Sequence, residues 1–166
     1  MIHRILTTEP ELCTGCRMCE LVCSLSKTGE LNLYRARLKI AIRDELGAFT
    51  PVICRHCIKP LCQSACPIPE AMERDEKTGA VTIMEEYCIG CRACFDACPF
   101  GAIRLDPEGS PLKCDLCGGD PLCVRHCPPR PLDGPKDKPP VEQSCLQYLK
   151  PHRTGKPGIK QSKRED

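Results

Sequence analysis

Short runs of alternating or β-branched residues are the clearest structural pattern in this chain. Residues 35–42, RARLKIAI, alternate polar and apolar over most of their length, which favours a half-buried strand. GAVTIM at 79–84, after a turn at 77–79, and GAIRLD at 101–106 are further short runs that begin with glycine. The pattern predicts small strands that flank loops.

The helical signals are equally brief. QSAC at 63–66 and FDAC at 95–98 fit short helices that end at Cys-Pro. Further on, VEQSCLQYL at 141–149 has four residues at i, i+4, i+7 and i+8, the spacing of one helical face: Val141, Cys145, Tyr148 and Leu149. This segment predicts a helix that packs either on its own chain or on another subunit.

The composition leaves little material for a hydrophobic core. The 166 residues allow one domain or two small ones. They include three Phe, three Tyr and no Trp, against seventeen Pro and twelve Gly. A bound metal group that cross-links loops would supply the stabilisation that a small hydrophobic core cannot.

Cysteine provides the candidate ligands for such a group. Sixteen of the seventeen cysteines fall into four quartets. The quartets are Cys13, Cys16, Cys19 and Cys23; Cys54, Cys57, Cys62 and Cys66; Cys88, Cys91, Cys94 and Cys98; and Cys114, Cys117, Cys123 and Cys127. The third reads CIGCRACFDACP, the bacterial cluster-binding run C-x2-C-x2-C-x3-C-P. The spacing predicts four [4Fe-4S] clusters held by sixteen thiolates.

Two other uses of cysteine fit this spacing less well. Zinc sites usually combine C-x2-C pairs that lie far apart in sequence, not runs of three plus one. Disulfide scaffolds are found in short secreted chains. The start of this chain, MIHRILTTEPEL, has no apolar signal-peptide core, no small-residue cleavage site and no twin arginine. Cysteines three residues apart on one loop would also cross-link little.

Charge and hydropathy bear on partners and location. The formal net charge is +2, and each oxidised cubane with four thiolates carries about −2, so four would bring the holoprotein to about −6. That balance gives no support for binding nucleic acid. No run of about 18 apolar residues occurs, so no membrane insertion is expected. The chain is predicted to be cytoplasmic, where thiols stay reduced.

The order of the quartets predicts the domain organisation. Quartets two and three lie close together and both end in Cys-Pro, so they form a central ferredoxin module at 50–107 inserted into an outer module at 1–49 and 108–132. The predicted fold class is α+β, with two interleaved bacterial-type 2[4Fe-4S] ferredoxin modules, small two-stranded sheets, short helices and an irregular Pro-rich tail. This basic tail at 133–166 is expected to be disordered or to dock on a partner.

The four-quartet layout resembles the iron-sulfur subunits of the dimethyl-sulfoxide-reductase and formate-dehydrogenase type. CTGCRMCELVCSLSKTGE, CRHCIKPLCQSACP and CDLCGGDPLCVRHCP are similar, more narrowly, to the small electron-transfer subunits of tungsten-pterin aldehyde oxidoreductases. Five residues separate Cys117 from Cys123, where the formate-dehydrogenase type tends to carry a longer insert. The resemblance covers residues 9 to about 130.

The resemblance implies that ligands cross between quartets, as in two-cluster ferredoxins. The implied sets are Cys13, Cys16, Cys19 and Cys127; Cys54, Cys57, Cys62 and Cys98; Cys88, Cys91, Cys94 and Cys66; and Cys114, Cys117, Cys123 and Cys23. The chain departs from the pattern in two ways. Cys23 precedes Ser24 instead of proline, and quartets two and four have wider central gaps.

The resemblance also implies an electron-transfer subunit that is not an enzyme on its own. Its expected partner is a large tungsten- or molybdenum-pterin catalytic subunit, with a flavin subunit or soluble ferredoxin as a further candidate. An iron-sulfur subunit of a formate dehydrogenase, reductase or hydrogenase complex is the alternative. An assembly protein that joins copies through its tail is an alternative of another class. A stand-alone enzyme is disfavoured because neither a G-x-G-x-x-G motif nor a P-loop occurs, and no catalytic residue stands out.

Seven residues outside the sixteen motif cysteines invite a functional interpretation. They are Arg17, Arg55, Arg92, Arg125, His56, His126 and Cys145. A cation near a cluster favours the reduced, more negative state and raises its potential, although each arginine could equally be a solvated loop residue. The histidines are expected to form hydrogen bonds or lie at the surface, because the thiolate count is already full. The odd cysteine is expected to be a small buried hydrophobe.

Overall fold

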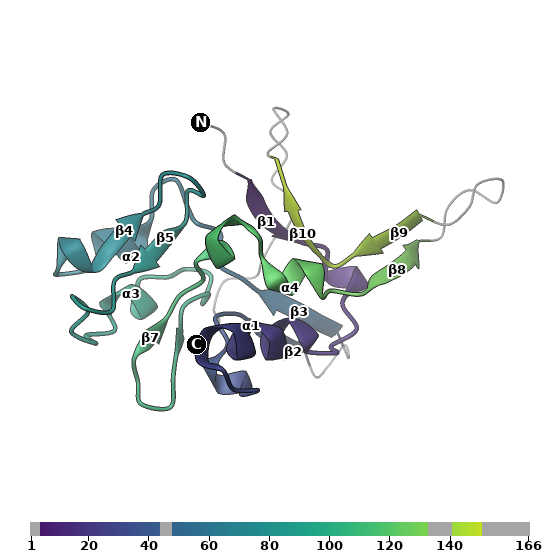
Figure 1. Cartoon of the computed structure of the whole chain (residues 1–166), viewed down its shortest axis with the longest axis horizontal. Helices are drawn as coiled ribbons and strands as arrows, with labels where there is room; N and C mark the ends of the chain where they lie inside the picture. Colours follow the sequence, from purple (N-terminus) through teal and green to yellow (C-terminus); the bar gives the residue numbers. More distant parts are fainter. Residues whose placement is uncertain (1–3, 44–47, 133–140, 151–166) are drawn as a thin grey trace.

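The computed structural model of the chain describes residues 4–43, 48–132 and 141–150 (Figure 1). Within these residues the strands form five two-stranded antiparallel sheets. The pairs are β1 (Ile5–Thr8) with β10 (Leu146–Leu149), β2 (Lys39–Arg43) with β3 (Ala48–Val52), β4 (Met72–Arg74) with β5 (Val81–Ile83), β6 (Arg104–Leu105) with β7 (Pro111–Leu112), and β8 (Pro129–Leu132) with β9 (Val141–Ser144). Two-stranded sheets are only marginally stable alone, so contacts outside the sheets matter for stability.

The helices are short and lie next to the cysteine loops. They are α1 (Met18–Thr28), α2 (Leu61–Ser64), α3 (Ala93–Asp96) and α4 (Leu122–Arg125), with 3-10 turns η1 (Pro10–Leu12), η2 (Leu33–Arg35), η3 (Pro69–Ala71) and η4 (Leu116–Gly119). The longest, α1, has 11 residues. None of the helices in the described ranges is long and apolar enough to cross a membrane.

Helix α1 is an element that the sequence pattern did not predict. It begins after Arg17, whose φ is +59°, and ends at Gly29, whose φ is +76° and whose N–H donates to the carbonyl of Leu25 at 2.9 Å. Glycine commonly ends helices in this way, because a side chain strains the left-handed conformation. The buried residues of the helix are Cys19, Glu20, Cys23 and Ser24. Two of them are polar, so the buried face lacks the apolar periodicity that reveals most helices.

Apolar side chains gather into two clusters. The larger contains Leu6, Ala36, Leu38, Ile40, Ile53, Ala80, Leu116, Leu146, Cys19, Cys23 and Cys123. The smaller contains Met72, Val81, Cys94 and Ile103. Helix α1 packs against α4, and α2 packs against α3. In Figure 1, α2 and α3 lie with β4 and β5 on one side, and α1 and α4 lie on the other with β1 and β10. Leu6 of β1 and Leu146 of β10, far apart in sequence, therefore share the larger core. The boundaries of the two ferredoxin modules stay a prediction.

The predicted short elements are present with shifted bounds. GAVTIM contains β5, and GAIRLD contains the two-residue β6. In RARLKIAI the strand starts only at Lys39, because residues 33–35 form a 3-10 turn whose Tyr34 N–H donates to the side chain of Asn32 at 3.0 Å. Helices α2 and α3 end two residues before the Cys-Pro positions, so these predictions are close to the structure.

The helix predicted at 141–149 is wrong. The segment forms two strands, β9 and β10, with Cys145 between them. An isolated nine-residue helix is marginal, whereas here β8 and β1 each offer an unpaired edge. The N–H of Glu9 also donates to the carbonyl of Cys145 at 2.8 Å, so this segment packs against residues near the N-terminal strand β1. The rest of the predicted tail, residues 133–140 and 151–166, lies outside the described residues.

A buried ion pair joins α1 to β6. The side chain of Glu20 is fully buried, and its Oε2 accepts a hydrogen bond from Arg17 Nε at 2.6 Å. Arg104 lies 3.6 Å from Glu20 Oε1 and donates to the carbonyls of Leu33 and Leu38 at 2.8 and 2.9 Å. The Arg104 guanidinium therefore pairs with a buried carboxylate that Arg17 also holds, and it donates to two carbonyls that lie far from it in sequence.

Replacing Arg104 with methionine is expected to lower the free energy of unfolding by about 3 kcal/mol, because a buried carboxylate loses one of its two partners. Anaerobic denaturant titration of the holoprotein measures this change. Arg125→Met is the control, since the Arg125–Asp120 pair at 3.0 Å is exposed and contributes less than about 1 kcal/mol. Equal losses in the two variants would contradict the structural role of Arg104.

Candidate metal centres

The sixteen motif cysteines line four cavities in the described part of the chain. The cavities gather Cys54, Cys57, Cys62 and Cys98; Cys13, Cys16, Cys19 and Cys127; Cys114, Cys117, Cys123 and Cys23; and Cys66, Cys88, Cys91 and Cys94. Each cavity takes three cysteines from one quartet and the last cysteine of another. These groupings are the same as the four ligand sets that the ferredoxin resemblance implies, and ligation itself stays a prediction.

The chemistry of each cavity fits an iron-sulfur cluster. Thiolates are the ligands that such clusters use, four to a cubane. Among the described residues, no three His, Cys, Asp or Glu side chains lie close enough to hold a single metal ion, and the motif cysteines line cavities. Burial raises the pKa of Cys94 to about 11 and that of Cys19 to about 12, so these thiols would release protons when they bind iron.

The loops of the first and third quartets repeat one backbone conformation. Gly15 and Gly90 have φ of +70° and +68°, and the arginines two residues later, Arg17 and Arg92, have φ of +59° and +64°. A residue with positive φ reverses the chain within a few positions, so the three cysteines of each loop face one cavity. At Gly15 a Cβ atom would lie 2.5 Å from the ring of Phe49, which leaves no space for a side chain.

The cavities form a continuous series. Cys54 lines both its own cavity and that of Cys114. Cys62 is close enough to Cys94 for its charge to contribute to the raised pKa of Cys94, although burial is the main cause. Cys19 has the same kind of influence on the pKa of Cys123, which burial chiefly raises. The order is therefore Cys66/88/91/94, Cys54/57/62/98, Cys23/114/117/123 and Cys13/16/19/127.

The two exposed cysteines lie at opposite ends of this series. Cys91 belongs to the first cavity and Cys16 to the last, and the other motif cysteines are buried or half-buried. Of the four, the cavity of Cys54 is the largest, about 180 Å³ against about 20, 20 and 10 Å³ for the others. The series has one solvent-accessible thiol at each end.

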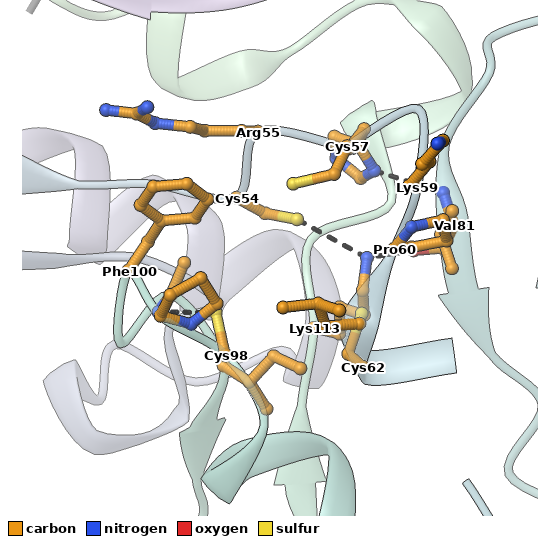
Figure 2. Close-up of a pocket in the computed structure, with 15 residues that line it drawn as sticks. Cys54, Arg55, Cys57, Lys59, Pro60, Cys62, Val81, Cys98, Phe100 and Lys113 are labelled. Carbon is orange, nitrogen blue, oxygen red and sulfur yellow. Dashed lines mark hydrogen bonds between the residues drawn. The ribbon is translucent and has the colours of Figure 1, made fainter. Parts of the chain in front are cut away.

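The Cys54 cavity contains polar groups besides its thiols. Figure 2 shows Lys113 in contact with Cys54, and its Nζ donates to Cys54 Sγ at 3.3 Å. His56 Nδ1 accepts a hydrogen bond from the N–H of Val81 at 3.1 Å, whereas its buried Nε2 has no partner among the described residues. Burial, followed by the charges of Lys113 and Arg74, lowers the pKa of His56 to about 3, so the imidazole is neutral at pH 7.

Of the four arginines singled out in the sequence, Arg17, Arg55 and Arg92 line cysteine cavities, and all four also contact a group other than a thiol. Arg17 pairs with Glu20, Arg92 Nε donates to the carbonyl of Gly109 at 3.0 Å, Arg125 pairs with Asp120, and the Arg55 guanidinium lies 4.1 Å from the centre of the Phe100 ring. His126 is exposed, with Nδ1 2.9 Å from the carbonyl oxygen of Leu122. The sequence-based interpretation missed Lys113, because lysine is normally exposed and nothing in the sequence marks its burial.

Cys145 is buried, as predicted, and it lies beside a cysteine set. It lines the cavity of Cys13, and the hydrogen bond between the two side chains lowers the pKa of Cys13 and raises that of Cys145. The last described segment of the chain therefore completes the wall of the cavity that contains the first cysteines.

Comparison with known families agrees with this chemistry. Residues 46–133 match the 4Fe-4S dicluster domain, and residues 10–29 match a 4Fe-4S binding domain. The chain belongs to the 4Fe-4S dicluster family. Its resemblance to ferredoxin-like iron-sulfur subunits is therefore confirmed, and the two matches cover all four quartets.

Individual relatives of this chain carry informative names. The aliphatic sulfonate oxidoreductase, polyferredoxin-like subunit, of Pyrococcus furiosus is 44% identical over 121 residues, 71% of this chain and 68% of that protein. A component of the anaerobic dimethyl sulfoxide reductase of Escherichia coli is 36% identical over 147 residues, 76% of this chain and 70% of that protein. The active site complex BamBC of benzoyl coenzyme A reductase with benzoyl-CoA has a chain 25% identical to this one, with a TM-score of 0.42, over 75% of this chain and 73% of that chain.

Proposed function

We propose that this chain is an electron-transfer subunit with four [4Fe-4S] clusters, one in each cysteine-lined cavity. The observation that carries the proposal is the series of four neighbouring cavities, each lined by one of the four sets of motif cysteines, with the exposed Cys91 and Cys16 in the first and last. A bound [4Fe-4S] cluster supplies one-electron transfer without a substrate site of its own. On this proposal the chain is not an enzyme by itself.

The protein supplies ligands, spacing and electrostatics. Sixteen thiolates would hold the clusters, and the left-handed loop residues aim three thiolates of each quartet into one cavity. Neighbouring sites lie close together, because Cys54 lines two of the cavities and Cys19 lies near Cys123 of the adjacent set. The exposed thiols at the two ends mark where electrons would enter and leave.

The proposed partner is a large tungsten-pterin oxidoreductase of the aldehyde-oxidising type, with a molybdenum-pterin subunit as the alternative. Two relatives are named as components of a sulfonate oxidoreductase and a dimethyl sulfoxide reductase, which supports a role in an oxidoreductase complex. The second partner would be a flavin subunit or a soluble ferredoxin. We infer a cytoplasmic complex, since free thiols must stay reduced until clusters are inserted.

The central test is anaerobic purification of the native complex. We expect about sixteen iron atoms and sixteen acid-labile sulfides per chain, and a large pterin-containing subunit in stoichiometric amount. Reducing the large subunit with its substrate should bleach the visible absorption of this chain and then reduce an added ferredoxin. Recovery of two or more zinc ions with little iron, or turnover without any partner subunit, would contradict the proposal.

A further inference from the structure

The environment of Lys113 is unusual for a lysine. It is 4% exposed, and its Nζ donates to Cys54 Sγ at 3.3 Å and to the carbonyl of Val81. Within the described part of the chain, no carboxylate forms an ion pair with it. A buried ammonium without a counter-charge is costly, so its negative partner must be the thiolates of this cavity and the group they bind.

His56 gives the same cavity a second donor. Because Nδ1 accepts the N–H of Val81, the proton of the neutral ring resides on Nε2. That N–H is buried and has no acceptor among the described residues, and His56 lines the cavity together with Cys54 and Cys57. A buried donor without an acceptor is costly, and a sulfur inside the cavity would satisfy it.

Among the described residues, the other three cavities lack an equivalent cation. Their basic residues either pair with carboxylates or lie at the exposed surface: Arg17 with Glu20, Lys27 and Arg37 with Asp115, and the exposed Arg92. A paired cation has most of its field cancelled by its partner, and an exposed one is screened by water. The buried charge of Lys113, which has no carboxylate partner among the described residues, lies in the cavity of Cys54, Cys57, Cys62 and Cys98.

We propose that Lys113 and His56 make the site of Cys54, Cys57, Cys62 and Cys98 the most easily reduced of the four. The inference rests on the proposed function and deepens it. A fixed positive charge and an N–H donor both stabilise the added negative charge of the reduced state, which raises the reduction potential of that site. An electron transferred from a neighbouring site would be held preferentially at this site before it is transferred to the next.

The test is a potentiometric titration of the full-length holoprotein followed by EPR. Lys113→Gln removes the charge and keeps a side chain that can donate to the carbonyl of Val81. At fixed ambient potential it should lower the reduced-to-oxidised ratio of the highest-potential site at least about tenfold, equivalent to about 59 mV for one electron. The other three midpoints should move less.

Lys59 provides the matched control, because it lines the same cavity but is exposed. Lys59→Gln removes an equal charge and should change the ratio less than about twofold, since solvent and salt screen it. His56→Asn should shift the same midpoint downward by less than Lys113→Gln. Asparagine tolerates the positive φ of 45° at this position, and its shorter side chain withdraws the donor.

A measurement on the unmutated protein covers the case in which the variants lose the cluster. With 15N in the lysine side chains, pulsed EPR of the first site to be reduced should show coupling to a 15N nucleus, and its absence would overturn the inference. If the highest of the four midpoint potentials is unchanged in Lys113→Gln, the inference about Lys113 is also overturned, but the proposed electron-transfer role is not. Wild-type protein without [4Fe-4S] clusters would overturn the proposed function itself.

Discussion

Replacing Cys66 with alanine is expected to remove up to about four iron atoms per chain from the site of Cys88, Cys91 and Cys94. Cys66 is the last cysteine of the second quartet, yet it lines the cavity of the third. A cubane that loses one of its four protein ligands becomes labile, while the three sites that do not use Cys66 keep all their thiolates. Iron and sulfide analysis of the anaerobically purified variant measures the loss.

Double variants distinguish crossed from uncrossed ligand sets by counting iron. If the sets cross, Cys66→Ala with Cys88→Ala damages one site and should remove no more iron than either single change. Cys66→Ala with Cys57→Ala damages two sites and should remove about eight atoms. Cys145→Ala is the control and should keep about sixteen, because Cys145 belongs to none of the quartets. The reverse result for the two double variants would refute the crossing.

Removing iron with a chelator under reducing conditions is expected to abolish cooperative unfolding. The larger core includes Cys19, Cys23 and Cys123 among its buried members, and the described sheets have only two strands each. Without the bound groups, these thiols would line empty space, and loops held by four ligands would regain their conformational freedom. Circular dichroism during denaturant titration should show a broad, gradual change in place of a single transition.

The untreated holoprotein in the same reductant serves as the control for this experiment, since it separates loss of iron from reduction of thiols. Hydrogen exchange supplies a second measurement. Backbone amides of α1 and of the β2–β3 pair should exchange far faster in the apoprotein than in the holoprotein. An apoprotein that keeps native protection there would show that the apolar contacts suffice without metal.

The cysteine arrangement was the most predictable part of the molecule. Spacing within a quartet is a local property, so tight loops such as 13–19 and 88–94 can be recognised from sequence alone. The grouping across quartets needed the ferredoxin resemblance, and the cavities have the same grouping. Short strands and helices next to the loops were predicted for the same local reason.

The features that escaped prediction depend on distant partners. Helix α1 was hidden because its buried face contains Glu20, which pairs with Arg17 and with Arg104, 84 positions later. Residues 141–149 have helical spacing but pair with β8 and β1, which the periodicity of the segment cannot reveal. Lys113 is buried where its Nζ donates hydrogen bonds to Cys54 Sγ and to the Val81 carbonyl, and both acceptors lie far away in sequence.

The crossed grouping of the cysteines also sets an order of synthesis. On the ribosome, the thiols of the two sets that lie within residues 54–98 have all been made once Cys98 has been added. Cys13, Cys16 and Cys19 precede the fourth cysteine of their set, Cys127, by more than 100 residues, and Cys145, which lines the same cavity, is made later still. On the proposed ligand sets, a cell that makes this chain must therefore keep Cys13, Cys16 and Cys19 reduced until Cys127 has been made.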